Sequence, residues 1–422
     1  MKARQFLFIT SFLVFIILPH NSYAQLHRNC GTMSHLRYQE VKHPFLKKRI
    51  EAQNIAIAKW NKSRSKASDD TIIHIPIVFH IIWTTAIQNI SAAQIFSQLF
   101  VLNQDFRHNN ADSINTPSQF QALMADVGVE FCLAHQDPNG NWTDGITRTH
   151  STKSVFDMNT DDAKFSAQGG YDAWDATKYL NIWIVPAITN NGSSDILGYT
   201  QMPGGNWSTD GIVIGYKYIG TMGTAHSPFN KGRTATHETG HWLGLYHIWG
   251  DDNGACWGSD YVDDTPNQAA YNYDCPTDPH ISCSNNGDMF MNYMDYTDDS
   301  CMNMFSLGQK ARMRAVLNTT RVAIKTSGRC MANAIIPASK EFNFQVYPNP
   351  SNQSINISNY PIHLRSFKVR IINMEGKQVY QSTYPANRQS INISIKELKS
   401  GLYLIQLSDD QNFGFNKLII QH

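Results

Sequence analysis

Hydrophobic residues gather into runs and periodic patterns from about residue 70 onward, and these patterns predict a globular domain. Residues 73–83 form a dense β-branched and aromatic run, which predicts a buried strand. Ser91 and Gln94 match a capping box, and the apolar residues that follow recur on one helical face. We therefore expect an amphipathic helix that packs on a sheet. The apolar positions of this helix are Ile95, Leu99, Leu102 and Phe106.

Shorter apolar runs continue this pattern through the middle of the chain. We expect further strands at residues 127–134, 179–185 and 211–218, and helices at residues 234–245 and 309–317. Loops rich in Gly, Asn and Asp separate these elements. Helices and strands mixed in this way indicate an α/β (α+β) core.

The pattern changes near residue 342, where short strand-like runs replace the longer elements. Turn signals such as Pro348-Asn349-Pro350 and Glu375-Gly376 separate several of these runs. About seven short strands in one stretch predict a small antiparallel β-sandwich, residues 343–422. The predicted strands are residues 344–347, 354–357, 367–372, 378–380, 390–395, 402–407 and 417–420.

Residues 1–24 have the pattern of an export signal. Lys2 and Arg4 supply positive charge, residues 6–18 form an apolar run, and Ser22-Tyr23-Ala24 offers a cleavage site. The apolar run is shorter than the roughly 20 residues of a membrane-spanning helix, and no later stretch approaches that length, so we expect no transmembrane anchor. A retained N-terminal anchor is the alternative to cleavage.

The charge balance argues against an electrostatic nucleic-acid binder. The chain of 422 residues has 35 Lys and Arg against 34 Asp and Glu, a formal charge of +1. Removing the two cations of the signal changes this charge to −1. Residues 25–68 are polar and rich in cations, and residues 61–70 have the composition of an exposed, cleavable linker.

The most informative segment has two histidines four residues apart, His237 and His241, whose imidazoles would project from one face of a helix and bind one metal ion. Glu238 between them can take a proton from a metal-bound water. Gly244 lets the helix end and the chain turn, so that His247 can supply a third nitrogen. Three ligands and one open position are typical of catalytic zinc. Structural histidines or a structural zinc would leave Glu238 without a purpose.

This segment and its surroundings resemble the metzincin zinc endopeptidases, and within them the secreted bacterial pappalysins. The resemblance covers roughly residues 73–317. It implies a metzincin-like catalytic domain, residues 69–332, with a twisted mixed sheet, an active-site helix and a methionine-containing turn under the zinc at Met294. Core filling is the alternative role of Met294. Besides the zinc motif, the resemblance rests on Gly232-Arg233-Thr234-Ala235-Thr236, Ile248-Trp249-Gly250-Asp251, Asp264-Thr265-Pro266 and Met291-Asn292-Tyr293-Met294-Asp295-Tyr296.

The activity that the resemblance implies is metal-assisted hydrolysis of peptide bonds in protein or peptide substrates. Zinc would polarise the scissile carbonyl, and Glu238 would accept a proton from the bound water and pass it to the leaving amine. Tyr296 matches a tyrosine that helps to hold the tetrahedral intermediate in similar enzymes, with simple packing as its alternative role. A binding protein on an inactive peptidase scaffold is the other function to consider. Such a scaffold can lose Glu238, which is present here.

Seven cysteines leave at least one thiol without an intramolecular partner. Resemblance to bacterial pappalysins implies two disulfides among the four cysteines that follow the zinc motif, whereas spacing alone allows three pairings. The implied pairs are Cys256–Cys283 and Cys275–Cys301. Cys132 and Cys330 are available for a third disulfide, which neither spacing nor the resemblance decides.

Cys30 is then the odd cysteine, ahead of the catalytic domain. It looks like the switch cysteine in the propeptides of similar enzymes, and its thiolate could take the zinc position that the catalytic water needs. The resemblance therefore implies that residues 25–68 are the propeptide of a latent zymogen, released by a cut near residues 62–66. A free or dimerising thiol is the alternative.

An acidic loop resembles a calcium-binding loop of the same family, and its oxygens suit that ion. The residues concerned are Asp260, Asp264 and Thr265. A solvated acidic turn is the alternative. In similar enzymes the residues after the methionine turn form the pocket for the residue that follows the cut. Asp298, Asp299 and Ser300 occupy that place, so an acidic pocket would favour Arg or Lys.

The C-terminal 80 residues resemble the sorting domain of the type IX secretion system of Bacteroidetes-type bacteria. The resemblance implies a partner, the secretion machinery, and a protein exported through the periplasm to the medium or the cell surface. An adhesive or carbohydrate-binding module is the alternative, because a sandwich does not determine function. The matching residues are Tyr347-Pro348-Asn349-Pro350, Gly376-Lys377, Ser400-Gly401-Leu402-Tyr403 and Lys417-Leu418-Ile419-Ile420.

Overall fold

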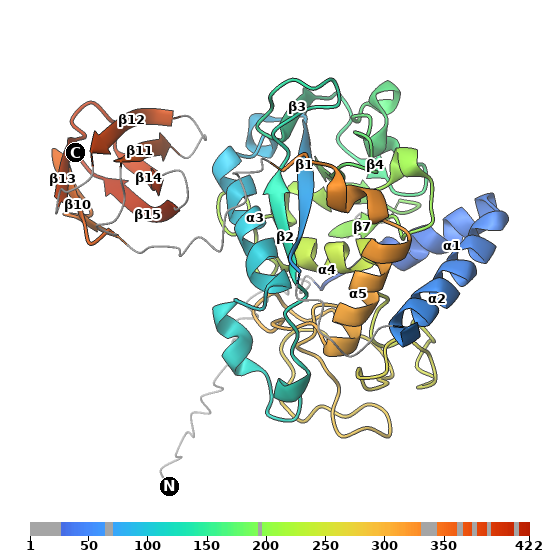
Figure 1. Cartoon of the computed structure of the whole chain (residues 1–422). Coiled ribbons are helices and arrows are strands. Elements are labelled where there is room, and N and C mark those ends of the chain that lie inside the picture. Colours follow the sequence, from blue (N-terminus) through green and yellow to red (C-terminus); the bar gives the residue numbers. More distant parts are fainter. Residues whose placement is uncertain are drawn as a thin grey trace, which may run out of the picture.

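The computed structural model of the chain contains a mixed α/β domain, two N-terminal helices packed on it, and an all-β C-terminal domain (Figure 1). The predicted export signal, residues 1–24, and residues 64–70 of the predicted linker lie outside the described residues. The described residues are 27–63, 71–192, 196–330, 344–360, 366–373, 378–385, 390–408 and 413–422.

The mixed α/β domain is built on a six-stranded sheet with the strand order β2-β1-β5-β8-β7, in which β3 also pairs with β1. Strand β7 lies antiparallel to β8 at one edge, and the other pairs are parallel. The mixed sheet is therefore confirmed. Its strands are β1 (Ile73–Trp83), β2 (Val129–Leu133), β3 (Ile146–His150), β5 (Leu180–Val185), β7 (Gly198–Thr200) and β8 (Ile212–Gly215), and a separate pair is β4 (Phe156–Asp157) with β6 (Ile188–Thr189).

The run at residues 73–83 is a strand, as predicted, and most of it is buried. Its length lets β1 pair with β2 along residues 73–77 and with β3 along residues 79–83. The other three predicted strands are present but shorter than the apolar runs. The last of them ends at Gly215, because residues 216–218 form a 3-10 helix.

Helix α3 (Ala92–Phe106) confirms the amphipathic pattern, since all four predicted apolar positions are buried. Ser91 caps the helix by accepting the backbone N–H of Gln94 at 3.2 Å. The second half of the predicted capping box is wrong. The buried side-chain amide of Gln94 donates instead to the carbonyl of Ile219 and the hydroxyl of Thr224, because those acceptors lie within its reach.

Helices α4 (Arg233–Trp242) and α5 (Leu307–Thr319) correspond to the two later predicted helices. Helix α4 is shorter than predicted because the chain turns at Gly244, which has φ +85°. Helix α5 begins two residues earlier, where Ser306 and Gln309 form a complete capping box. Helix α4 contacts α3, β7 and β8, so it lies against the edge of the sheet where β7 ends the strand order.

Two helices precede the sheet, α1 (Thr32–Lys42) and α2 (Phe45–Ser63). These helices were not predicted, because their apolar residues are few and are interspersed with many cations. The apolar residues that pack inward are Leu36, Leu46, Ile50 and Ile57. Residues 61–63, assigned to the linker, are the end of α2. Helix α2 lies alongside α5 (Figure 1).

The C-terminal domain consists of two antiparallel sheets that share one hydrophobic core. The seven predicted strands and the small all-β architecture are confirmed. One sheet has the order β13-β10-β9 and the other β12-β11-β14-β15. The strands are β9 (Gln345–Tyr347), β10 (Ser354–Ser358), β11 (Ser366–Asn373), β12 (Gln378–Pro385), β13 (Ser390–Ser394), β14 (Gly401–Ser408) and β15 (Phe413–Ile420).

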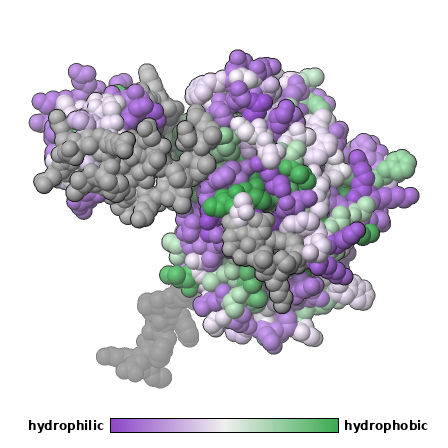
Figure 2. Space-filling view, viewed as in Figure 1, coloured by the Kyte–Doolittle hydropathy of each residue, from purple (hydrophilic) through white to green (hydrophobic). Residues whose placement is uncertain are grey.

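The surface is predominantly polar on the face drawn in Figure 2, where hydrophobic residues form small separate patches. Within the described part of the chain, no helix combines the length and the apolar character that crossing a membrane requires. The larger hydrophobic clusters are inside the two domains.

Candidate metal centre and cleft

Helix α4 and the turn after it bring three histidines together. Nε2 of His241 lies 3.2 Å from Nε2 of His237 and 3.1 Å from Nε2 of His247. All three rings are buried. Ligand atoms of the three histidines and the Sγ of Cys30 lie within 4.8 Å of one another, so the predicted ligands form one group.

Each of these histidines has an acceptor for its other ring nitrogen, Nδ1, which holds the ring proton there and leaves a lone pair on Nε2. The acceptors are the carbonyl of Tyr293 for His237 (2.7 Å), the carbonyl of Leu245 for His241 (2.8 Å) and the carboxylate of Asp251 for His247 (3.0 and 3.1 Å). Three lone pairs therefore point at one place without a proton between them.

This group of donors fits a zinc ion. Tetrahedral Zn–N bonds of about 2.0–2.1 Å place neighbouring nitrogens roughly 3.3 Å apart, close to the separations observed. Burial lowers the pKa of His241 to about 3, and burial followed by the two neighbouring histidines lowers the pKa of His237, so these rings are neutral and able to bind a metal. Burial and Glu238 raise the pKa of the Cys30 thiol, so a thiolate there requires a cation beside it.

Glu238 is buried beside the histidines, and two threonines hold one of its carboxylate oxygens. Its Oε2 accepts hydrogen bonds from the hydroxyl of Thr200 at 2.8 Å and from the hydroxyl of Thr32 at 2.9 Å. The Thr32 hydroxyl in turn accepts the backbone N–H of Thr200. Burial raises the pKa of Glu238, which makes it a stronger base than an exposed carboxylate.

The turn that contains Met294 packs directly under α4. A Cβ at Gly240 would lie 2.5 Å from the Sδ of Met294, so glycine is required for this approach. Gly244 also has two constraints, a positive φ and a Cβ position 2.7 Å from a methyl group of Val316. These two glycines let the helix rest on the methionine turn and let the chain bring His247 back to the other histidines.

Tyr296 lies at the rim of the same group, with its ring centroid 5.1 Å from that of His247. Its hydroxyl accepts the backbone N–H of Cys30 at 3.2 Å and donates to the carbonyl of Cys30 at 3.3 Å. Burial and then Cys30 raise the pKa of Tyr296, so the hydroxyl keeps its proton. The hydroxyl is thus a hydrogen-bond donor beside the candidate metal position.

The N-terminal segment, residues 27–31, lies in the cleft, and Cys30 forms a strand-like bridge with Gly198. Gly31 donates its N–H to the carbonyl of Gly198 at 2.9 Å, and Asn29 accepts the N–H of Leu197 at 2.9 Å. These bonds attach the segment in parallel to the edge of β7. A Cβ at Gly31 would lie 2.6 Å from the Sδ of Met158, which shows how closely the cleft walls enclose the segment.

Arg28 fills a buried pocket next to the metal group, although the sequence analysis assigned it no role. Its guanidinium contacts the carboxylate of Asp299 at 2.5 Å, and both side chains are almost fully buried. It also donates to the Thr234 hydroxyl and the Thr297 carbonyl and lies over the ring of Phe229. Of the two aspartates expected in the acidic pocket, Asp299 holds the arginine.

Three disulfides occur in the structure, and Cys30 is the free cysteine among the described residues. Two of the disulfides are the pairs implied by the resemblance. The third joins the strand β2 to residue 330, which follows α5 in the chain. The three disulfides are Cys132–Cys330, Cys256–Cys283 and Cys275–Cys301.

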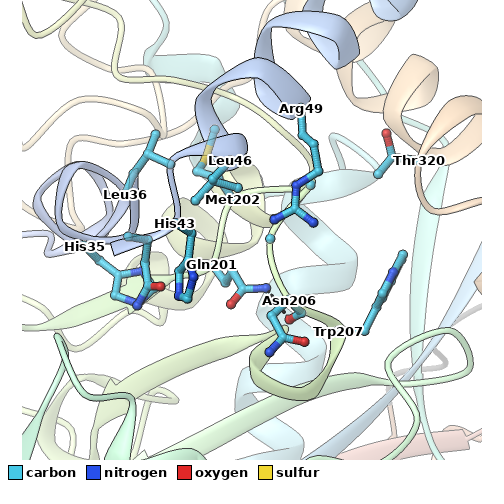
Figure 3. Close-up of a pocket in the computed structure, with 13 residues that line it drawn as sticks. His35, Leu36, His43, Leu46, Arg49, Gln201, Met202, Asn206, Trp207 and Thr320 are labelled. Carbon is cyan, nitrogen blue, oxygen red and sulfur yellow. Dashed lines mark hydrogen bonds between the residues drawn. The ribbon is translucent and has the colours of Figure 1, made fainter. Parts of the chain in front are cut away.

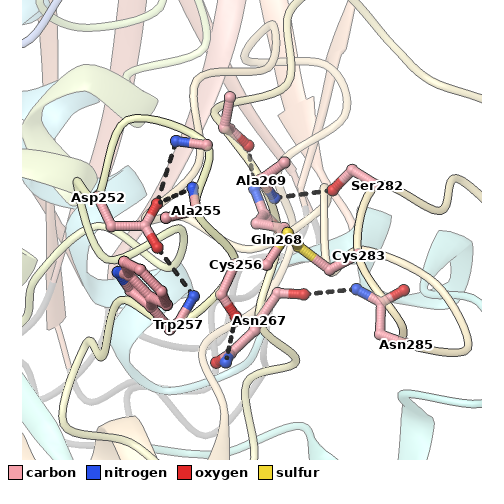
Figure 4. The surroundings of a disulfide bond; sticks show 12 residues. Asp252, Ala255, Cys256, Trp257, Asn267, Gln268, Ala269, Ser282, Cys283 and Asn285 are labelled. Carbon is pink, nitrogen blue, oxygen red and sulfur yellow. Dashed lines mark hydrogen bonds between the residues drawn. A yellow bond between two sulfur atoms is a disulfide. The ribbon is translucent and has the colours of Figure 1, made fainter.

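The disulfide between Cys256 and Cys283 joins two loops (Figure 4). Residues 253–254 and 269–270 of these loops line the cleft. Asp252 accepts four backbone N–H groups of its own loop, those of residues 254, 255, 257 and 258. Asn285 donates to the carbonyl of Asn267 at 2.6 Å and so joins the two sides of the disulfide. These contacts stabilise loops that contain few other regular elements.

Of the three predicted calcium ligands, Asp260 and Thr265 contact each other, and Asp264 has other partners. Thr265 donates to Asp260 at 2.7 Å, and burial raises the pKa of Asp260 to about 7. Asp264 instead accepts the Ser306 hydroxyl and the N–H of Gly308 at the start of α5. Asp264 therefore has a structural role in addition to any role in binding a cation.

A separate hollow of about 480 Å³ lies between the N-terminal helices and the loop that follows β7, away from the metal group (Figure 3). His35 lines it and contacts the buried carboxylate of Asp161 at 3.1 Å. Asp161 also pairs with Lys164 at 2.8 Å. The contact between His35 and Asp161 attaches α1 to the domain through a buried polar network.

Sequence reasoning missed several residues of this site. Thr32, Thr200 and Arg28 touch the proposed base or the pocket, but threonine and arginine at these spacings match no motif. Asp251 is different, because it lies four residues after His247 in the matched segment and was quoted only as part of the resemblance. A carboxylate that follows a candidate ligand by four residues is a detectable signal for a group that orients the ring.

Comparison with protein families identifies two regions of the chain. Residues 164–318 match the family of peptidases described as pregnancy-associated plasma protein-A. Residues 345–421 match the secretion system C-terminal sorting domain. The first match contains the three histidines and Glu238, and the second spans the all-β domain.

Relatives and solved structures agree with the first match. The chain is 31% identical over 300 residues to an extracellular metalloprotease of Arthroderma benhamiae, which covers 69% of this chain and 91% of that protein. It is similar to a variant of promirolysin from Tannerella forsythia, at 47% identity and a TM-score of 0.64 over 72% of this chain and 98% of that one. It is also similar to mature mirolysin in complex with a cleaved peptide, at 50% identity and a TM-score of 0.57 over 62% and 97% of the two chains.

Proposed function

The chain belongs to the pregnancy-associated plasma protein-A family of metallopeptidases, and from this premise we propose that His237, His241 and His247 hold its catalytic zinc with Glu238 as the base. The protein is a secreted zinc metalloendopeptidase made as a zymogen. The main support for these residue roles is geometric. The Nε2 atoms of the three histidines converge beside the buried carboxylate of Glu238.

In the proposed mechanism of peptide hydrolysis, the zinc ion and the protein side chains have separate roles. Zinc, when bound, polarises the scissile carbonyl and makes water more acidic. Glu238 takes the proton of the attacking water and delivers it to the leaving amine. Thr200 holds Oε2 of Glu238, so the base has one orientation. The hydroxyl of Tyr296 donates to the oxygen on which negative charge develops.

Latency is proposed to depend on three contacts of residues 25–68, which we interpret as the propeptide. Cys30 offers its sulfur at the position that the water needs. The hydroxyl of Thr32 donates a hydrogen bond to Oε2 of Glu238. Arg28 fills the Asp299 pocket. The propeptide therefore occupies the metal, the base and a substrate pocket together.

The same pocket supports a proposal for substrate preference. A buried carboxylate, a carbonyl and a hydroxyl surround Arg28, and they match the donors of a guanidinium. We propose that a substrate places an arginine there, directly after the bond that is cut. The substrate would replace Arg28 when the propeptide leaves.

The substrate proposal predicts that Asp299→Asn lowers kcat/KM for peptides with Arg after the cut by about 10–100-fold, since it removes one charged hydrogen-bond acceptor worth roughly 1.5–3 kcal/mol. Asparagine keeps an oxygen for the N–H groups of Lys231 and Arg233, which now donate to Asp299. The measurement is peptide-library profiling of the mature enzyme, with mass spectrometry of the cuts. The matched control is Asp298→Asn, which should change the profile little. An unchanged arginine preference in Asp299→Asn would refute the proposal.

A calcium ion is a further proposal, held by Asp260, Asp264 and Thr265. Carboxylate and carbonyl oxygens suit the ion. Each oxygen of Asp264 accepts one hydrogen bond and retains a lone pair for a cation. The buried carboxylate of Asp260 supports the proposal because a cation would offset the cost of its charge.

Removal of calcium by a selective chelator should lower the melting temperature of the catalytic domain by about 5 °C, because a ligand that binds only the folded state stabilises it. Differential scanning calorimetry with and without added calcium measures the shift. The Asp260→Asn variant should show no shift on chelation. If the wild type had the same melting temperature in both conditions, the calcium site would be refuted and the loop would be a solvated acidic turn.

The C-terminal domain is a secretion sorting domain, and the protein is secreted or attached to the cell surface. We propose that residues 343–422 contact the secretion machinery, that residues 1–24 are the export signal, and that residues 69–332 are the catalytic domain. The mature enzyme would then consist of the catalytic domain with or without its sorting tail.

A further inference from the structure

The cleft next to the metal group has an aromatic wall, defined here as Trp249, Tyr296, Tyr271 and Tyr273. The ring centroids of Trp249 and Tyr296 are 4.7 Å apart, those of Tyr296 and Tyr271 are 5.3 Å apart, and those of Tyr271 and Tyr273 are 4.6 Å apart. At its inner end the wall touches His247, whose ring stacks on Trp249 at 4.2 Å. The wall therefore leads from the metal group outward along the cleft.

The outer end of the wall holds a side chain of the N-terminal segment. The ring of His27 stacks on Tyr273, with centroids 4.2 Å apart and planes at 22°. Its Nδ1 lies 3.8 Å from the carboxylate of Asp274. A planar ring at this place therefore has a stacking partner and a nearby negative charge.

The order of residues in the segment relates this contact to the substrate. Cys30 is at the candidate metal position, Arg28 is in the Asp299 pocket, and His27 is one residue farther along the segment. Successive side chains of an extended chain point to opposite sides, so Arg28 enters the buried pocket while His27 faces the wall. A substrate that runs in the opposite direction and places an arginine in the same pocket would have its next residue on the His27 side of that pocket, toward the wall.

We propose that the enzyme selects an aromatic or imidazole ring at the second residue after the cut, with Tyr273 as the stacking surface and Tyr271 behind it. The inference rests on the proposed function, because it assumes that an arginine occupies the Asp299 pocket. Aromatic ring pairs prefer centroid distances of about 4.5–7 Å. The His27 ring approaches the face of Tyr273 to 4.2 Å, so this face is open to a stacked ring. Tyr273 would thus determine specificity without touching the reacting atoms.

The test uses fluorogenic peptides that all carry Arg directly after the scissile bond and vary only in the next residue, which is Tyr, Phe, His, Leu or Ala. Leu controls for hydrophobic burial without a ring. We expect kcat/KM of the mature enzyme to be about 3–10-fold higher for Tyr and Phe than for Leu, the size of one ring–ring contact. Tyr273→Phe should keep this ratio and Tyr273→Leu should bring it close to one.

Two different failures can be separated in this experiment. If none of the arginine peptides is cut, the proposed function fails. If the arginine peptides are cut but the Tyr and Leu peptides react equally in the wild type, only the inference about the wall is overturned. A ring preference that survives in Tyr273→Leu would also overturn it.

Discussion

We expect Glu238→Gln to lower kcat/KM of the mature enzyme for a peptide substrate by about 10²–10⁴-fold and to leave zinc binding intact. Glutamine has nearly the same shape and still offers an oxygen to the hydroxyl of Thr200, so the local packing is maintained. It cannot accept the proton of the attacking water. The loss therefore measures the general-base step and not the folding of the site. Hydrolysis of a fluorogenic peptide and metal analysis of the same sample give the two quantities.

The matched control for this variant is a histidine ligand. His241→Ala should reduce both the zinc content and the activity, whereas Glu238→Gln should reduce the activity alone. Normal proteolysis by Glu238→Gln would contradict the assigned base. A wild type that cuts no peptide would instead favour the alternative of an inactive scaffold, so the wild-type rate must be measured in parallel.

Cys30→Ala should shorten the life of the latent precursor. The variant removes the sulfur that stands among the three histidine nitrogens, so water can reach the metal while the other propeptide contacts persist. Because Arg28 and Thr32 still hold the segment, we expect conversion to the mature form to be about 10-fold faster and not immediate. The measurement is the rate at which the purified precursor converts, followed by gel electrophoresis and peptide hydrolysis.

Ser34→Ala is the control in the same segment, because Ser34 is exposed and four residues from the switch. It should mature at the wild-type rate. If Cys30→Ala matured as slowly as Ser34→Ala, the thiol would not maintain latency. A disulfide-linked dimer on a non-reducing gel, lost in Cys30→Ala, would then support the alternative of a dimerising thiol.

Structural features that depend only on residues close in sequence were predicted best. The i, i+4 pair of histidines and the glycine turn after them determine the geometry of the metal group, since helix periodicity and positive φ are local properties. Residues 73–83 and the short C-terminal strands were recognised for the same reason. The N-terminal helices were not, because their stability comes mainly from packing on the catalytic domain and less from a clear amphipathic pattern.

Local pattern by itself therefore predicted the proposed metal ligands, the proposed base and the order of the longer helices and strands. The tertiary structure alone decided which of Asp298 and Asp299 faces the pocket, that Arg28 fills it, and that Cys132 lies beside Cys330. The two members of each pair are 198 and 271 residues apart in the chain. Many other long-range contacts would be compatible with the same sequence pattern. Only the packing of the sheet, α4 and the cleft loops brings one pair of side chains within contact distance and excludes the others.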